Sequence, residues 1–266
     1  MNIDNVAQIP KIVDKTHFAI LVLPKKYGLN EVREQLIAKN TVFLEPKVHD
    51  RQKTAIINVD DIAELERITR TKQSKSLTIV LLATETMGDQ AQNKFLKLLE
   101  EPGDNIHFVF VTEDSSNLLS TVRSRGQIYH IKKINKAASQ NLAKSLSPNL
   151  DTKTLQQMMF LANGLPGEIK KLATDKRYLA SQAELVDAAK TILGGSDFAV
   201  IKLVNQLKDN RAKAAQIVDT SITIAKETLK KNPSFIAKLD ALERIQAQLS
   251  ASGNVRLCLV ANLLDV

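Results

Sequence analysis

The stretch QAQNKFLKLLEEPGDNIHFVFVTEDSSNLLSTVRSRGQIYHI, residues 90–131, carries the pattern that decides the fold. It predicts a helix, a turn, a buried strand at 107–111, a loop, a short helix and a further strand. After His107 the strand is apolar, which is typical of a parallel strand covered on both faces. The short helix ends near Ser124-Arg125-Gly126, so we expect Arg125 at the edge of a domain, where it could reach a neighbouring molecule.

The same alternation extends towards the N-terminus. Apolar runs predict strands at 17–23, 41–44, 77–82, 107–111 and 128–131. Helical spacing predicts helices at 29–39, 59–71, 89–99 and 118–122. Asn58 is the expected N-cap of the second of these helices, because two acidic residues follow it in the first turn. Buried strands that alternate with helices predict a parallel sheet with helices on both faces.

The pattern changes after Lys133. Three short helices are expected at 135–146, 151–163 and 167–172. Helical periodicity continues to the end, with breaks at 194–196, 209–210, 232–233 and 252–253. The fold class is therefore α/β plus all-α, and the predicted domains are an α/β domain at 1–133, a small three-helix domain at 134–177 and a helical domain at 178–266.

Composition narrows the function classes. The 266 residues are 44% apolar with only 4% aromatic and no Trp, so the core must be aliphatic. The net charge of +8 permits nucleic-acid contact, although a solvated surface explains it equally well because the charge is spread along the chain. The single cysteine, Cys258, excludes an intrachain disulfide and a cysteine-based zinc site. We expect a cytoplasmic protein, because no signal-peptide pattern or membrane-length apolar run is present.

Five segments in this order resemble the AAA+ clamp-loader subunits of bacterial DNA polymerase III. They are the helix end Leu98-Leu99-Glu100-Glu101-Pro102, the strand His107–Val111 leading into Thr112, Ser124-Arg125-Gly126 where the family has Ser-Arg-Cys, the turn 162–167 (ANGLPG), and 252–257 (SGNVRL). The resemblance implies an AAA+-like parallel sheet with flanking helices, a small three-helix lid domain and a helical collar domain for oligomerisation. Within the family, the missing residues described next favour the delta-prime type.

The phosphate-binding loop G-x-x-x-x-G-K-[ST] is absent after the first predicted strand. The loop at 23–30, LPKKYGLN, has one glycine, Gly28, and two lysines, Lys25 and Lys26. The lysines could attract phosphate by charge, but glycines are needed for backbone N–H groups to cradle it. The sequence thus predicts a degenerate loop without ATP bound in cis.

The carboxylates of a Walker B element are absent as well. Aligned through Asn93 and the Glu-Glu-Pro element, their places are Leu82 and Ala83. Glu85 lies two positions further along, which moves its carboxylate too far to coordinate Mg²⁺ at about 2.1 Å. We therefore expect no Mg²⁺ at this place.

The resemblance places the sensor-2 region at Gly164, Pro166, Gly167 and Glu168. Active relatives carry Arg where this chain has Glu168, and a carboxylate there would repel a γ-phosphate. Together with the two losses above, this implies a non-hydrolysing subunit with no catalytic residue in cis and no enzyme activity. The zinc-binding cysteines of many relatives are also missing, so no metal or cofactor is expected.

The resemblance implies that Arg125 is an arginine finger that acts in trans on the ATP of an adjacent subunit. A guanidinium suits this task because it is always charged and donates in a fixed fork. Ser124 is expected to cap or orient the turn. The alternative is a surface arginine in a salt bridge. Because Gly126 stands where the family has Cys, the sequence does not decide how stiff the loop beside Arg125 is.

A basic cluster of Arg67, Arg70, Lys72 and Lys75 lies at a predicted helix end and the following loop. It could face DNA phosphates inside a ring of subunits, and a solvated face is the alternative.

The resemblance as a whole implies a stator subunit of the replicative clamp loader. Its partners would be homologous ATPase subunits, a delta-type subunit and, through the complex, the sliding clamp and primer-template DNA. An ATPase with a degenerate phosphate loop and a basic DNA-binding adaptor remain the alternatives.

Overall fold

The computed structural model describes residues 2–3, 8–37, 40–49, 53–71, 75–229, 232–251 and 253–263. It divides into two compact units, residues 1–174 and 175–266. The predicted boundary between 133 and 134 lies inside the first unit and stays a prediction. Two residues named from the sequence, Lys72 and Ser252, lie outside the described residues.

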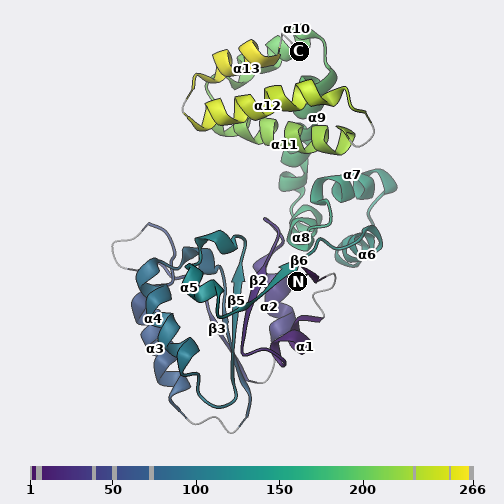
Figure 1. Ribbon diagram of the computed structural model, residues 1–266. Coiled ribbons are helices and arrows are strands. Elements are labelled where there is room, and N and C mark those ends of the chain that lie inside the picture. The colour runs from purple at the N-terminus through teal and green to yellow at the C-terminus, as the bar shows by residue number, and fades with distance from the viewer. Residues whose placement is uncertain are drawn as a thin grey trace. The chain divides into compact units, whose positions relative to one another are not determined.

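Six strands of the described residues form one parallel sheet in the first unit, in the order β1-β6-β2-β5-β4-β3 (Figure 1). The strands are β1 (Asn2–Ile3), β2 (Phe18–Val22), β3 (Thr41–Leu44), β4 (Leu77–Leu81), β5 (Ile106–Thr112) and β6 (Gln127–Ile131). The helices between them are α1 (Ile9–Val13), α2 (Leu29–Leu36), α3 (Val59–Thr69), α4 (Asp89–Glu100) and α5 (Ser120–Arg123). The predicted α/β class is thereby confirmed.

Alternate strand residues point to opposite faces, as the period of a strand requires. Phe18 and Ile20 of β2 join the core under α3 and α4. There Phe95 packs edge-on against Phe108 and tilted against Phe110, and Phe18 packs edge-on against Phe110. Ala19 and Leu21 join the opposite core. That second core includes residues of α1 and α2, and Figure 1 shows α3 and α4 on one side of the sheet and α1 and α2 on the other.

Helix α3 begins as expected at Asn58. The side chain of Asn58 accepts a hydrogen bond from the backbone of Asp61, and the Asp61 carboxylate accepts one from the backbone of Asn58. This reciprocal capping box satisfies two backbone donors at the start of the helix.

The predicted start of the helix at 118–122 is wrong. A 3-10 turn covers Ser115–Asn117, and α5 begins only at Ser120. The side chain of Gln92 from α4 explains the difference, because its Oε1 accepts from the backbone N–H of Leu119 at 2.7 Å. That bond holds Leu119 in an extended conformation, with ψ at 144°.

Three helices complete the first unit: α6 (Lys136–Leu146), α7 (Thr152–Ala162) and α8 (Pro166–Thr174). They contact one another, and α8 also contacts α2. Asn135 and Asp151 cap α6 and α7 through their side chains, so both helices begin where the sequence predicts.

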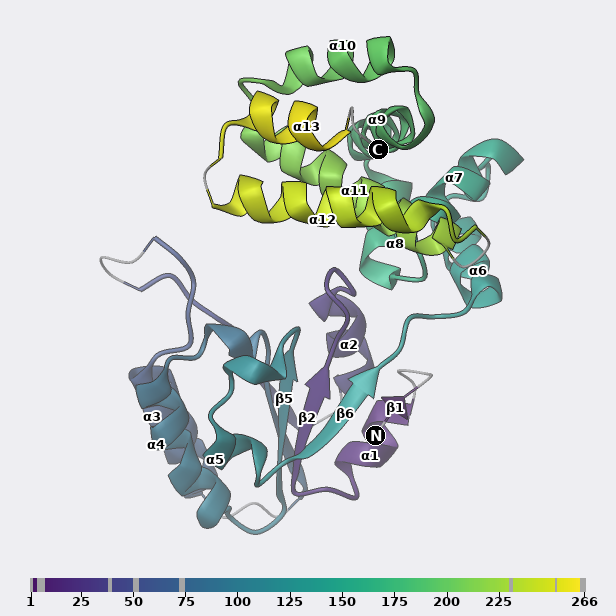
Figure 2. The ribbon, with the colours of Figure 1, turned by 45° about the horizontal axis from the view of Figure 1, so that its top comes forward.

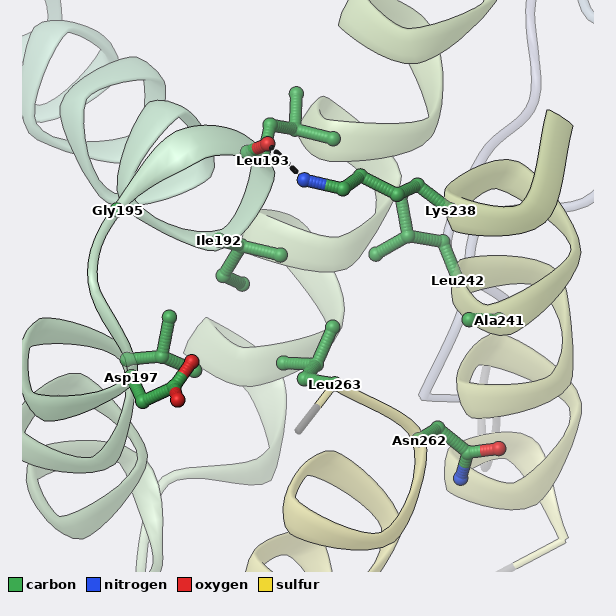
Figure 3. A pocket seen from close by; sticks show the side chains of 10 residues that line it. Ile192, Leu193, Gly195, Asp197, Lys238, Ala241, Leu242, Asn262 and Leu263 are labelled. Carbon is green, nitrogen blue, oxygen red and sulfur yellow. Dashed lines mark hydrogen bonds between the residues drawn. The ribbon is translucent and has the colours of Figure 1, made fainter. Parts of the chain in front are cut away.

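The described helices of the second unit are α9 (Lys176–Gly194), α10 (Asp197–Leu207), α11 (Arg211–Leu229), α12 (Phe235–Ser250) and α13 (Val255–Leu263), and short turns join them. Helix α11 packs between α9 and α12, and α13 contacts both α10 and α12 (Figure 2). Lys238 reaches the end of α9, where its Nζ donates to the carbonyl of Leu193 at 2.7 Å beside a cavity of about 50 Å³ (Figure 3). No helix of the described residues is long and apolar enough to span a bilayer.

Candidate functional site

The loop predicted to be a degenerate phosphate loop joins the end of β2 to the start of α2. Lys25 and Lys26 are exposed, and Lys26 has a left-handed backbone with φ at 63°. The backbone N–H of Lys26 donates to Glu113 Oε1 at 3.0 Å, and its Nζ lies 3.9 Å from Glu168 Oε1. The loop therefore directs Lys26 towards carboxylates of its own chain.

Two glycines bring this loop into contact with the first turn of α8. Gly28 has φ at 102°, and a Cβ on Gly167 would lie 2.7 Å from Tyr27 O and 2.8 Å from Gly28 Cα. The backbone N–H of Gly167 donates to Tyr27 O at 2.7 Å. A helix N-terminus is suited to anions, but here a carbonyl of the same chain uses one of its donors.

Lys170 ties α8 to α2 beside the glycines. Its Nζ lies 2.7 Å from Glu31 Oε1 and 3.1 Å from Glu34 Oε1. The hydrogen bond to Glu31 is the main reason that the pKa of Lys170 is raised above its usual value. These contacts of Gly28, Gly167, Glu31, Glu34 and Lys170 are called the clasp below.

Tyr27 fixes the loop from inside. Its side chain is only 1% exposed and packs in the core on the α1 and α2 side of the sheet. Burial, and then the nearby Glu31 carboxylate, raise the pKa of Tyr27 to about 12. Among the described residues, its buried hydroxyl has no hydrogen-bond partner.

An open groove of about 980 Å³ runs along the clasp. Its charged lining comprises Lys26, Arg33, Lys170 and Lys171 against Glu31, Glu34, Glu113 and Glu168. Four cations against four carboxylates leave no formal excess of positive charge.

The predicted Walker B places are apolar and buried. Leu82 is 3% exposed and Ala83 is 9% exposed, with Ala83 in a left-handed conformation at φ 51°. The next carboxylate, Glu85, accepts from the hydroxyl of Thr112 at 2.8 Å and from the backbone N–H of Glu113 at 3.3 Å. Sequence reasoning missed this contact, which joins the end of β5 to the turn after β4.

The residues predicted as the sensor-2 region lie in the turn from α7 into α8 and at the start of α8. Gly164 has φ at 77°, and its carbonyl accepts from the backbone of Ile134 at 2.9 Å. Pro166 begins α8, a place that suits proline because its missing N–H would have no helical partner. Glu168 is buried, and Lys26 is one of its neighbours.

Arg125 follows the short helix α5 and is exposed. One terminal amino group, Nη1, donates to Thr121 O at 3.0 Å, and the other, Nη2, donates to Glu100 Oε1 at 2.8 Å. Ser124 is exposed too, and its hydroxyl donates to Thr121 O at 3.1 Å, which closes the end of α5. The salt bridge that the sequence left as the alternative is present, while Arg125 stays 40% exposed.

Gly126 lies against the sheet. A Cβ at this position would come within 2.8 Å of Phe18 Cδ1 and of Ile20 Cδ1. Its backbone therefore packs directly on β2 side chains, and the loop after Arg125 is held without a side chain at 126.

The basic cluster is only partly described. Arg67, Arg70 and Lys75 are exposed, and Arg70 pairs with Glu66 of the same helix. Lys72 lies outside the described residues. Contact with DNA stays a prediction for this cluster.

Comparison with known proteins shows what this chain is similar to. Residues 30–135 match the family model described as DNA polymerase III, delta subunit. The chain is 28% identical over 93 residues to DNA polymerase III subunit delta′ of Haemophilus influenzae, and 27% identical over 165 residues to that of Pseudomonas aeruginosa. These alignments cover 34% and 60% of this chain, and 28% and 49% of the two relatives, so they span about half of a curated relative at most.

The fold has a solved counterpart. A DNA polymerase III gamma subunit-related protein of Thermotoga maritima aligns with a TM-score of 0.53 at 18% identity, over 98% of this chain and 97% of that one. This likeness shows the fold alone. The family model and the two curated relatives confirm the predicted resemblance to clamp-loader subunits of DNA polymerase III, of the delta-prime type.

Proposed function

We propose that this chain is a non-hydrolysing stator subunit of a DNA polymerase III clamp loader, which offers Arg125 to the ATP site of an adjacent subunit. The observation that carries the proposal is the clasp. Gly28 and Gly167 touch so closely that not even a methyl group fits between them, so a phosphate cannot enter there. A subunit built in this way keeps one arrangement of loop and α8 whether or not ATP is present.

The remaining groups of the pocket support the same conclusion. The carboxylate nearest to the Walker B places, Glu85, accepts hydrogen bonds from its own chain. The groove has balanced charge, and Glu168 stands where an arginine would be needed. Hydrolysis would require the opposite arrangement, with Mg²⁺ and cations around the γ-phosphate.

Arg125 is the residue that acts on a neighbouring subunit in this proposal. It is exposed, and its five N–H donors suit a phosphate better than a lysine would. In this proposal its nucleotide belongs to a homologous subunit with an intact Gly-Lys-Ser/Thr loop. The sliding clamp and primer-template DNA are partners through the complex, which works in the cytoplasm where the chromosome is replicated.

Substitution of Arg125 tests the finger. In a loader reconstituted with its ATPase subunits, we expect Arg125→Ala to lower clamp-stimulated ATP hydrolysis by about 10³-fold or more. Arg125→Lys should fail largely as well, since a point charge does not reproduce the planar fork. The control is Lys97→Ala, which removes an exposed cation from α4. Unchanged hydrolysis with Arg125→Ala, in a loader that still assembles, would refute the finger.

Two binding measurements separate the alternatives. Calorimetric titration of the full chain with ATP and Mg²⁺ should give no binding, whereas a micromolar Kd would support a degenerate ATPase. Titration with a primer-template duplex should show little affinity for the chain without partners. Strong binding with a steep salt dependence would favour the DNA-binding adaptor instead.

A further inference from the structure

The guanidinium of Arg125 is held by a second element of the fold. Glu100 is the last residue of α4, and its Oε1 accepts from Arg125 Nη2 at 2.8 Å. Thr121 O, in α5, accepts from Nη1 at 3.0 Å. The fork is thus bonded on both amino groups by two helices that contact each other.

Both partners of this pair reach solvent. The Arg125 side chain is 40% exposed and the Glu100 side chain is 55% exposed, so neither is packed in place by the core. A guanidinium has five N–H donors, and the two bonds use one hydrogen each. Three N–H donors stay available for a further acceptor, so Glu100 need not leave when Arg125 meets a phosphate.

We propose that Glu100 is a positioning residue for Arg125, which holds the guanidinium at the surface in the orientation that a neighbour's phosphate meets. This inference rests on the proposed function of Arg125. A long side chain with many rotamers loses conformational freedom when it binds, and a bond made beforehand reduces that loss. Transfer of a phosphoryl group depends on such placement, because the protein contributes mainly position and charge.

The location of Glu100 supports a role in placement. It ends α4, where the helix dipole places partial negative charge beside the carboxylate. Both attract a cation to the end of this helix. The neighbouring Glu101 is also exposed but makes no bond to Arg125, so it provides a matched control within the same segment.

The first experiment needs only the isolated full chain. NMR relaxation of arginine Nε groups, with Arg125 assigned by its loss in Arg125→Lys, measures how far the guanidinium is restrained. We expect Glu100→Ala to lower the order parameter of Arg125 and Glu101→Ala to leave it unchanged. An Arg125 signal equally mobile in wild type and Glu100→Ala would overturn the inference, whatever Arg125 does in a complex.

The second experiment uses the reconstituted loader. Glu100→Ala should lower kcat for ATP hydrolysis by about two- to fivefold, the range of an exposed ion pair, with little change in KM. Glu100→Gln keeps an oxygen acceptor at the same length and should recover part of the loss. Unchanged or faster hydrolysis with Glu100→Ala would overturn positioning. A restrained Arg125 in the isolated chain, combined with no effect of Arg125→Ala in the loader, would instead refute the proposed function.

Discussion

Replacement of Gly167 by alanine tests the clasp directly. The new Cβ would lie 2.7 Å from Tyr27 O, 2.8 Å from Gly28 Cα and 3.1 Å from Gly28 N. All three are backbone atoms, so no rotation of a side chain can relieve the contact. The first turn of α8 and the loop must therefore move apart.

The cost follows from these distances. Ordinary contacts of a Cβ begin near 3.4 Å, so the gap to Tyr27 O must open by about 0.7 Å. The 2.7 Å bond from Gly167 N–H to the same carbonyl would then lengthen to about 3.4 Å, which is longer than the usual range for N–H···O bonds and therefore weakens it. Overpacking costs about 1–3 kcal/mol and the weakened hydrogen bond up to about 1 kcal/mol. We expect local opening to become easier by about 2–3 kcal/mol, which is roughly 30- to 150-fold.

Native-state hydrogen exchange with mass spectrometry can measure this change. Peptides that cover 24–30 and 164–174 should exchange faster in Gly167→Ala. Gly88→Ala is the control in the same unit, because nothing lies within 4 Å of a Cβ at that position. Equal protection of both peptides in Gly167→Ala and wild type would refute the clasp, and with it the argument that a phosphate is excluded here.

Four further results are expected. Tyr27→Phe should leave the thermal midpoint unchanged or raise it, by up to about 1 kcal/mol in stability, because an unpartnered buried hydroxyl is removed. Lys170→Met should cost about 1 kcal/mol at neutral pH; since the pKa of Lys170 is raised in the fold, thermal melts should show this difference disappear as the pH rises through that raised value. Burial, and then His107, lower the pKa of His17, so stability should fall as the pH drops below about 6.5, and His17→Asn should flatten this dependence in thermal melts. Gly126→Cys should cost about 1–3 kcal/mol in urea unfolding, because the added atoms meet β2 side chains.

Local pattern predicted most of the fold. Short, largely apolar runs such as Leu77–Leu81 favour a buried strand, and a capping residue followed by acidic residues, such as Asn58, favours a helix start. Two elements near the N-terminus, β1 and α1, were missed because two and five residues are too short to show a period. The start of α5 was wrong because a side chain from α4 competes for its backbone, a contact that lies 27 positions away in the chain.

The sequence predicted which residues the candidate site lacks, but it did not predict most of the contacts that the site contains. The missing glycines and carboxylates could be read from the loop at 23–30 and from Leu82 and Ala83. The contacts that occupy this place instead could not be predicted from the sequence, because Gly28 and Gly167 come together only when α8 packs on α2. The bond from Arg125 to Glu100 was missed as well, although Glu100 lies in the helix-end motif that carried the family resemblance. The motif was sufficient to indicate the family, but it did not indicate that Glu100 contacts Arg125.

The strand order has a consequence for synthesis of the chain. The central strand β2 pairs with β5 and β6, and Phe18 meets Phe108 about 90 residues further along. At a translation rate of about 5–20 residues per second, β2 waits roughly 5–20 s for its first partner. During that interval the apolar segment FAILV has both edges free, which exposes it to pairing with other chains. The nascent first unit should therefore need protection until β5 has left the ribosome, even though the finished sheet covers β2 on both sides.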